Sequence, residues 1–335
     1  MIKRIVGLRE IAGQFDLYLV DQYGVLHDGV IAYPGAIDAW NRLGSDGQKV
    51  VVLTNSGKDG SDNLARLASL GFANPIHTVV SSGEVGLQLV RSGALGPHFA
   101  IGADACVIGR HGDHYAFSSD DFRMVSRPQD AAFLVFAGSD APRSSLDSYR
   151  TMLARAAQAG VPAICVNPDI AMIRDGQLVP APGAIARIYE DLGGSVEYVG
   201  KPYRAIFRHA LTVAAGAEAR VVMVGDSPEH DVSGARGDGV VDAARPDRHS
   251  PIAVRTGPAP PVRRLWRHAG FPGGVVQVVG GAARGSSHPR FADDRVKRSR
   301  RWVRGKNWAP LALRKSSIAF AGGSRTLSLR ESTNH

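Results

Sequence analysis

The chain has 335 residues, of which 44% are hydrophobic and 21% are charged, the balance of a globular protein long enough for two domains. Its apolar runs are too short to cross a bilayer, which excludes an integral membrane protein. The N-terminus lacks the apolar stretch and cleavage site of a signal peptide, so we expect a cytoplasmic protein with no membrane partner. Cys106 and Cys165 lie in apolar runs, which favours core residues over metal ligands or a disulfide.

The charge is distributed unevenly along the chain. Residues 240–335 contain 19 Lys and Arg against 5 Asp and Glu, a net charge of +14. Residues 1–239 therefore carry −5 of the total of +9. A mildly acidic body followed by a strongly basic last third predicts two separate parts.

In chain order, short apolar runs alternate with amphipathic stretches up to about residue 239. The runs predict buried strands of a mostly parallel sheet, at Leu17–Val20, Val50–Leu53, Phe99–Ile101, Phe133–Ala137, Ala163–Val166 and Val221–Val224. The stretches between them predict helices, at Ala36–Leu43, Asp62–Leu70, Leu146–Ala159, Ile185–Leu192 and Arg204–Ala214. This alternation predicts an α/β fold with a Rossmann-like, doubly wound parallel sheet.

Three predicted strands end in polar side chains. Asp21 follows the first strand, Thr54-Asn55-Ser56 ends the second, and Gly225-Asp226 with Asp231 follows the last. Each alone is as well explained by a turn or a helix cap. Together, and with Lys201 preceding the last strand, they indicate a site at the carboxyl edge of the sheet.

These four motifs, in this order, resemble those of the haloacid dehalogenase (HAD) superfamily, in its class IIA branch of NagD-like and nitrophenylphosphatase-like hydrolases. The resemblance covers about Phe15 to Ala235. It extends to accessory segments that are similar to the nucleophile loop, the cap exit and the lysine motif of that branch: Gly24-Val-Leu-His-Asp28-Gly29, Tyr33-Pro34-Gly35-Ala36, Asn167-Pro-Asp169, Pro182-Gly183-Ala184 and Val199-Gly-Lys-Pro202.

The resemblance implies the role of each motif in phosphoryl transfer. Asp21 would attack phosphorus and form an aspartyl phosphate. Mg²⁺ would be bound by Asp21, Asp226 and the backbone carbonyl of Tyr23, with Asp231 supporting the metal or its waters. Phosphate oxygens would be bound by groups from two motifs, namely Thr54, Asn55, Ser56 and Lys201.

One position departs from the family pattern. The phosphatases of this superfamily usually carry a second aspartate two residues after the nucleophile as general acid and base, and here that residue is Tyr23. A phenol with a pKa of about 10 is a poor proton donor at neutral pH, and general acid–base catalysis contributes about 10²–10⁴-fold. We therefore expect a slow or specialised enzyme.

Three explanations for this departure stay open. Another group could replace the acid, with His27, Asp28, Asp169 and Asp175 as candidates, although His27 is more simply a loop histidine. The substrate could be an activated ester or acyl phosphate that needs no acid. Or the protein could bind a phosphorylated ligand without hydrolysing it.

The resemblance also implies an inserted α/β cap between the threonine and lysine motifs. We expect core residues at 1–81 and 200–239 and the cap at 82–199, where it would exclude water and select the leaving group. Candidate substrate contacts in the cap are Asn167, Asp169, Arg174 and Asp175, for each of which a surface turn explains the residue equally well. The family implies a small phosphorylated substrate, such as a sugar phosphate or nucleotide monophosphate. A homo-oligomer is compatible with the sequence.

Residues 240–335 show neither the periodicity nor the family pattern of the body. A basic appendage could bind nucleic acid, but the segment has no aromatic stacking pattern and no nucleic-acid module, which argues against such a partner. We interpret the coincident changes as a shift of reading frame near residue 237. The core would then lack its last strands, expose a sheet edge, and carry a largely disordered tail.

Overall fold

The computed structural model describes residues 3–5, 7–72, 78–214, 219–237, 252–255 and 275–282. Most of the basic segment, including its densest run at 295–306, lies outside the described residues. Within them, no helix has the length and apolar character needed to span a bilayer.

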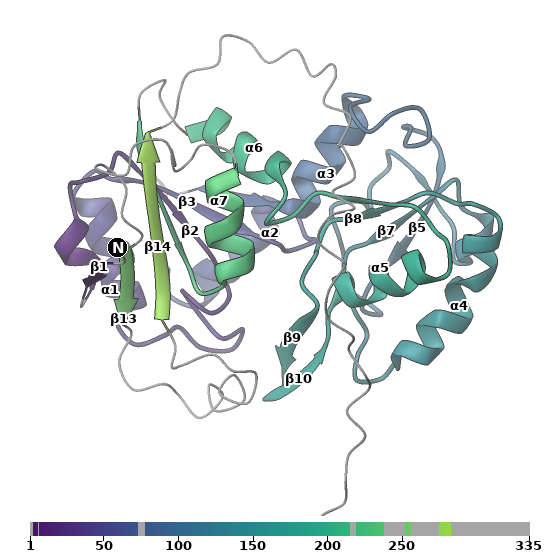
Figure 1. Ribbon diagram of the computed structural model, residues 1–335, viewed down its shortest axis with the longest axis horizontal. Helices are drawn as coiled ribbons and strands as arrows, with labels where there is room; N and C mark the ends of the chain where they lie inside the picture. The colour runs from purple at the N-terminus through teal and green to yellow at the C-terminus, as the bar shows by residue number, and fades with distance from the viewer. Residues whose placement is uncertain are drawn as a thin grey trace, which may run out of the picture. The chain divides into compact units, whose positions relative to one another are not determined.

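The larger of the two main sheets has seven strands (Figure 1). Its strands, in spatial order, are β1 (Lys3–Ile5), β13 (Ile252–Arg255), β14 (Val275–Ala282), β12 (Arg220–Gly225), β2 (Leu17–Val20), β3 (Lys49–Thr54) and β4 (Thr78–Ser81). Neighbouring strands pair in parallel, except that β14 is antiparallel to both β12 and β13. The carboxyl ends of β2, β3 and β12 therefore meet at one edge.

Helices and short helical turns connect these strands. They are η1 (Leu8–Ile11), α1 (Ala36–Ser45), α2 (Gly60–Ser69), α3 (Ser82–Arg91), α6 (Arg204–Ala214), a π-helical turn η3 (Pro228–Val232) and α7 (Ser233–Gly237). Side-chain caps fix three of the starts: Asp59 accepts the Asp62 amide at 2.8 Å, Ser81 accepts that of Glu84 at 3.2 Å, and Ser227 accepts that of His230 at 3.1 Å. These bonds satisfy amides that have no partner within their own helix.

The second sheet has five parallel strands. In spatial order these are β11 (Val196–Tyr198), β8 (Ala163–Cys165), β7 (Phe133–Phe136), β5 (Asp104–Ile108) and β6 (Arg123–Met124). It is accompanied by α4 (Leu146–Gln158), α5 (Pro182–Asp191), the short turn η2 (Pro128–Asp130) and the hairpin β9 (Ala171–Arg174) and β10 (Gln177–Pro180). We call residues 104–198 the cap segment.

The helix α3 contacts both parts of the chain. It packs against β4 and α6, and at Gly86 an added Cβ would lie 2.8 Å from Val166 Cγ1, beyond β8 of the cap segment. The predicted domain boundary at residue 82 would assign this whole helix to the cap. The boundaries at 82 and 199 stay a prediction.

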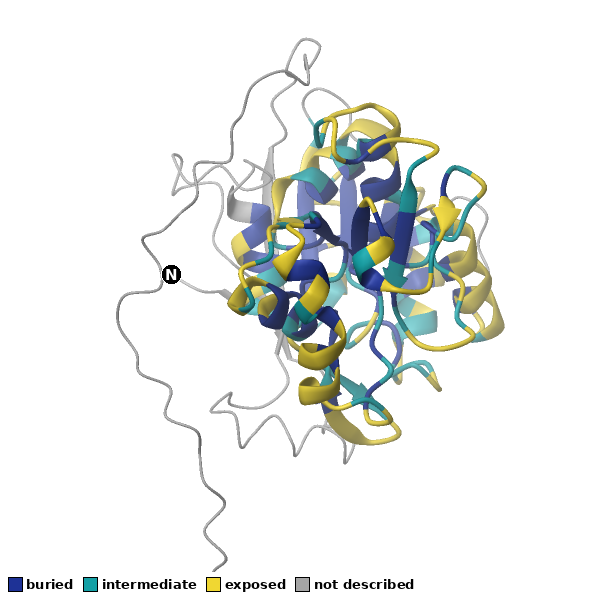
Figure 2. Cartoon of the chain, turned by 90° about the vertical axis from the view of Figure 1, so that its right-hand side faces the viewer, coloured by how far each residue is buried: buried dark blue, intermediate teal, exposed yellow. Residues whose placement is uncertain are grey.

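One apolar cluster contains residues from both sheets, whose buried strands are seen in Figure 2. It includes Leu19 of β2, Val51 of β3 and Phe133 of β7, all at most 1% exposed. Phe133 packs edge-on against Phe99 and Phe122, with ring centroids 5.6 and 5.4 Å apart. Because one cluster includes both sheets, we expect them to unfold together.

The cysteines lie where the sequence predicts. Cys106 and Cys165 are buried and neither forms a disulfide. Burial raises the pKa of the Cys106 thiol to about 11, which keeps it protonated and unreactive at neutral pH.

Five of the six predicted apolar strands match β2, β3, β7, β8 and β12, whereas the strand predicted at Phe99–Ile101 is wrong. Gly96 and Gly102 flank that run with φ of 92° and 79°. This left-handed backbone turns the chain on both sides, so Phe99 enters the core as a single buried side chain. The strand begins later, at Asp104.

The expectation of an uncovered sheet edge after β12 is also wrong. β14 pairs with β12 over Arg220–Gly225 and continues to β13, which pairs with β1. The apolar run within residues 273–285 supplies β14, which takes up the backbone hydrogen bonds that β12 would otherwise expose. The interpretation as a shifted reading frame stays a prediction.

Candidate functional site

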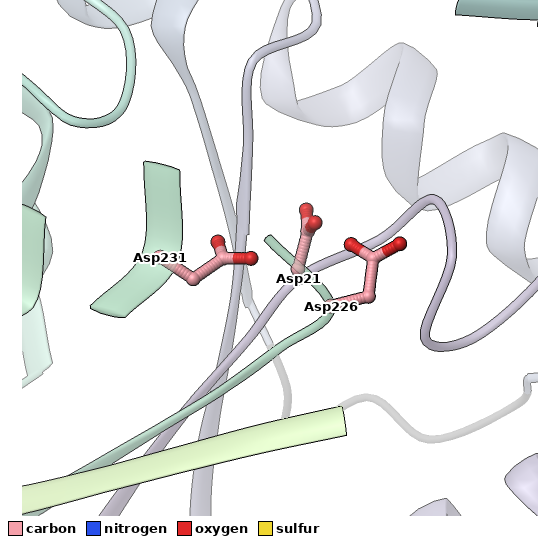
Figure 3. Close-up of side chains that lie close together, drawn as sticks. All are labelled: Asp21, Asp226 and Asp231. Carbon is pink, nitrogen blue, oxygen red and sulfur yellow. The ribbon is translucent and has the colours of Figure 1, made fainter. Parts of the chain in front are cut away.

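Asp21 and Asp226 directly follow two neighbouring strands. β2 and β12 pair in parallel, with Val20 opposite Val224, and the Asp21 amide donates to the Val224 carbonyl at 2.8 Å. Each aspartate follows the end of its strand by one residue. The pairing register therefore brings the two carboxylates side by side at the carboxyl edge of the sheet (Figure 3).

Two glycines leave the space that these carboxylates need. A Cβ on Gly24, where φ is 86°, would lie 2.2 Å from an Asp226 carboxylate oxygen. A Cβ on Gly225 would lie 2.1 Å from an oxygen of Asp231. Both positions therefore require glycine if the acidic cluster is to keep this geometry.

Lys201 lies between two of the acidic side chains. Its Nζ is 2.7 Å from Asp21 Oδ1 and 2.7 Å from Asp231 Oδ1, and its side chain is only 3% exposed. The other Asp231 oxygen accepts the Ser227 amide at 3.0 Å. Asp231 thus comes from the turn η3 and holds the ammonium group against Asp21.

Burial and neighbouring charges set the protonation of this group. Burial opposes the charge on Lys201, but the carboxylates of Asp21 and Asp231 outweigh it and raise the pKa of the ammonium group. Burial raises the pKa of Asp21 well above its usual value; Lys201 lowers it, and Asp231 and Asp226 raise it further. Burial and the two neighbouring carboxylates thus both oppose the ionised form of Asp21.

The acidic cluster fits a divalent cation. Asp21, Asp226 and Asp231 each offer one oxygen, and these three atoms lie within 4.8 Å of one another (Figure 3). A divalent cation would offset the repulsion among three carboxylates that lie this close together. Carboxylate oxygens are the ligands that Mg²⁺ and Ca²⁺ prefer. The Tyr23 carbonyl as a fourth ligand stays a prediction.

Three of the four residues expected to bind phosphate lie at the end of β3. Thr54 is 2% exposed, and its hydroxyl accepts the Ser56 amide at 3.3 Å. Ser56 accepts from Gly83 and Ser82 through its carbonyl, at 3.0 and 3.1 Å, which fixes the loop to the start of α3. The side chain of Asn55 is turned instead toward the backbone of Lys201.

Tyr23, which the resemblance places where the family usually has its second aspartate, is 49% exposed. Its ring packs edge-on against His27 with centroids 4.5 Å apart. Partial burial raises the pKa of the phenol, Arg66 lowers it and Asp113 raises it again, with a net rise. A phenol that holds its proton more firmly than usual is a still weaker acid at neutral pH.

His27, a candidate for the missing acid, is fully buried. Its Nδ1 accepts the Gly29 amide at 2.9 Å, and Nε2 has no hydrogen-bond partner among the described residues. Burial, together with Arg66, lowers the pKa of His27 to about 4. The histidine is therefore neutral at pH 7 and organises the loop. Asp28 likewise holds this loop by accepting the Val30 and Ile31 amides.

The four cap residues expected near the substrate lie in two places. Arg174 donates to the carbonyls of Ser139 and Ala141, at 3.0 and 2.5 Å, and thus braces a loop of the cap segment. Asp175, with φ of 49°, forms the turn between β9 and β10.

The other two cap candidates follow β8. Asn167 accepts the Asp169 amide at 3.1 Å through Oδ1. Asp169 contacts the core directly, since its Oδ1 accepts from Asn55 Nδ2 at 2.9 Å. Of the four cap candidates, the structure thus brings Asp169 to the core motifs.

The structure adds His230, for which the sequence predicts no role: its Nδ1 lies 3.2 Å from Asp169 Oδ1. Its position directly before Asp231 is the only signal that could have indicated it. A similar contact joins Lys58, four residues after Thr54, to Asp113 of the cap segment at 3.5 Å.

Comparisons with known proteins agree with the family resemblance seen in the sequence. The family model for haloacid dehalogenase-like hydrolases matches residues 18–122, and a HAD-hydrolase-like model matches 198–243. Chronophin from Mus musculus is 28% identical over 243 residues, covering 68% of this chain and 80% of the relative.

The solved structures that are similar to this chain include a hydrolase and a phosphatase. A haloacid dehalogenase-like hydrolase from Brucella suis 1330 has a TM-score of 0.60 and 28% identity, covering 72% of this chain and 88% of its own. A glycerol phosphate phosphatase from Mycobacterium tuberculosis in complex with magnesium has a TM-score of 0.54 and 22% identity. The match covers 69% of this chain and 68% of the phosphatase chain. The second likeness, at this identity, concerns the fold alone.

Proposed function

The chain belongs to the haloacid dehalogenase superfamily of hydrolases, and on this premise we propose that it hydrolyses the phosphate ester of a small metabolite through Asp21. The observation that carries the proposal is the ammonium group of Lys201, buried 2.7 Å from both Asp21 and Asp231 beside Asp226. A buried cation next to a strand-end carboxylate prepares a site for an incoming anion. The match to the family model for haloacid dehalogenase-like hydrolases agrees with this reaction class.

In the first step, a carboxylate oxygen of Asp21 bonds to phosphorus while the bond to the ester oxygen breaks. Lys201 neutralises negative charge on the transferring group, and the Thr54 hydroxyl donates to one of its oxygens. In the second step, water attacks the aspartyl phosphate, which releases inorganic phosphate and restores the carboxylate.

We propose that Mg²⁺ is bound by Asp21 and Asp226, with Asp231 supporting it through Lys201. When bound, the cation would offset the charge repulsion between the Asp21 carboxylate and the phosphate. Such a cation would also lower the pKa of Asp21 and so favour the nucleophilic carboxylate. The acidic cluster supports this assignment.

Because Tyr23 is a weak acid, the rate of hydrolysis should depend strongly on the leaving group. With no acid at this position, the ester oxygen leaves as an anion, so esters of acidic alcohols and acyl phosphates should react fastest. Sugar phosphates and nucleotide monophosphates are the proposed natural class, hydrolysed slowly. Binding of a phosphorylated ligand without turnover is the second candidate, and the weak acidity of the Tyr23 phenol is the observation that favours it.

The test is phosphate release from p-nitrophenyl phosphate and acetyl phosphate, with and without Mg²⁺. We expect Mg²⁺-dependent turnover that Asp21→Asn lowers by at least about 10³-fold, since the amide is not a nucleophile. Asp104→Asn, at an exposed ion pair of the cap segment, is the matched control and should keep activity. Folded wild-type protein that binds phosphate but hydrolyses neither substrate would favour the ligand-binding candidate.

A further inference from the structure

The side chain of Asn55 is occupied by the backbone of Lys201. Asn55 Oδ1 accepts the Lys201 amide at 2.6 Å, and Nδ2 donates to the Lys201 carbonyl at 3.1 Å. Asn55 is 5% exposed, and a Cβ on Gly200 would lie only 2.6 Å from its Oδ1. The amide thus holds Lys201 by both backbone polar groups and fixes the origin of its side chain.

Asp169 reaches this amide from the cap segment. Its Oδ1 accepts from Asn55 Nδ2 at 2.9 Å and lies 3.2 Å from His230 Nδ1. Its own backbone is held locally, since the amide donates to Asn167 Oδ1 at 3.1 Å and the carbonyl accepts from Gly183 at 2.9 Å. The carboxylate is therefore attached to the connection that leaves β8.

Asp169 Oδ1 thereby contacts two residues, Asn55 and His230, that help to hold the ammonium group of Lys201 in place. Through Asn55 it reaches the backbone of Lys201. Through His230 it reaches the turn that carries Asp231, whose Oδ1 accepts from Lys201 Nζ at 2.7 Å. A shift of Asp169 would release both supports together.

We propose that Asp169 is a positioning residue, which holds Lys201 against Asp21 when the segment after β8 contacts the core; this role rests on the proposed function. Asp169 acts here through Asn55 and His230, in place of the substrate contact expected from the sequence. A displacement of about 1 Å in a catalytic group can cost about 10²-fold in rate. A small shift of Lys201 after the loss of the Asp169 contacts should therefore lower the rate measurably.

The experiment compares Asp169→Ala with Asp169→Asn. The alanine removes both contacts, whereas the asparagine keeps an oxygen that can accept from Asn55. With p-nitrophenyl phosphate and Mg²⁺, we expect Asp169→Ala to lower kcat about 10- to 100-fold and to change KM by less than about threefold. Asp169→Asn should retain most of the wild-type kcat. Asp191→Ala, a cap carboxylate with a 68% exposed side chain, is the matched control and should equal wild type.

Amide hydrogen exchange of a peptide that includes Lys201 supplies a second readout. The Lys201 amide donates to Asn55, so its exchange should accelerate about tenfold or more in Asp169→Ala and remain slow in Asp169→Asn and Asp191→Ala. Unchanged exchange in Asp169→Ala overturns the positioning role, and so does faster exchange with unchanged kcat.

The same experiment separates this role from the proposed function. A wild type that hydrolyses neither p-nitrophenyl phosphate nor acetyl phosphate overturns the hydrolase and the positioning role with it. A wild type that turns over, with Asp21→Asn inactive and Asp169→Ala as fast as wild type, overturns the positioning role alone.

Discussion

The two sheets are built alike and end differently. β2 and β12 of the seven-stranded sheet, and β7 and β8 of the five-stranded sheet, are all short, parallel and buried. β2 and β12 are followed by Asp21 and Asp226, which meet beside Lys201. β8 of the cap segment is followed by Asn167 and Asp169, whose side chains bond to the backbone and to the core.

This difference shows that the residues that determine the fold are not the residues that form the site. Apolar side chains on both faces of a parallel strand are enough to bury it between layers of helices. Chemistry depends on the one or two residues after the strand, which contribute little to the core. The same architecture can therefore supply a reactive cluster in one sheet and a contact that orients it in the other.

The largest expected effect tests whether the two sheets are energetically separate. Phe133→Ala in β7 removes a fully buried ring that packs against Phe99 and Phe122, and should destabilise the protein by about 3–5 kcal/mol. Because Phe133 and Leu19 belong to one cluster, urea unfolding of Phe133→Ala and of Leu19→Ala should each shift a single transition. Two transitions, with only one displaced by each variant, would mean that the sheets unfold independently.

A smaller effect concerns the strand end at β2. Tyr23→Asp introduces the carboxyl group that can protonate a leaving oxygen, so turnover of an alkyl phosphate should rise about 100-fold. Turnover of p-nitrophenyl phosphate should change by less than about threefold, since its leaving group needs little protonation. Tyr23→Asn, similar in size but unable to transfer a proton, is the control for lost bulk. An equal gain in Asp and Asn variants would assign the effect to space instead of acid catalysis.

The smallest effect is the pH dependence contributed by His27. The pKa of His27 is about 4 in the folded protein, whereas its ordinary value is 6.5. Between these two pH values the imidazole binds a proton in the unfolded chain but not in the folded protein. Stability should therefore be complete above pH 6.5 and decrease as the pH falls toward 4, by roughly 2–3 kcal/mol.

The measurement is the free energy of unfolding from urea titrations at several pH values, for wild type and His27→Asn. The asparagine side chain can accept the Gly29 amide but does not titrate. The difference between the two proteins should shrink as the pH falls toward 4. A difference independent of pH would show that His27 is protonated in the folded protein at higher pH than its burial suggests.

Local pattern predicted much of the fold and failed where flanking residues changed the backbone. The runs at residues 17–20 and 133–137 lie in β2 and β7 because their apolar side chains need no other information to favour burial. Phe99–Ile101 has the same composition, but the turns at Gly96 and Gly102 exclude a strand. The run at residues 275–279 is also apolar, but its pairing with β12 is decided by a register with residues far away in the sequence.

The sequence by itself determined the α/β architecture and the order of Asp21, Thr54, Lys201 and Asp226, because strand periodicity and strand-end residues are local properties. Only the tertiary structure decided that Asn55 holds Lys201 and that Asp169 contacts Asn55, a residue 114 positions away. Such a contact depends on how two sheets pack, and a polar side chain in a turn gives no local sign of its distant partner.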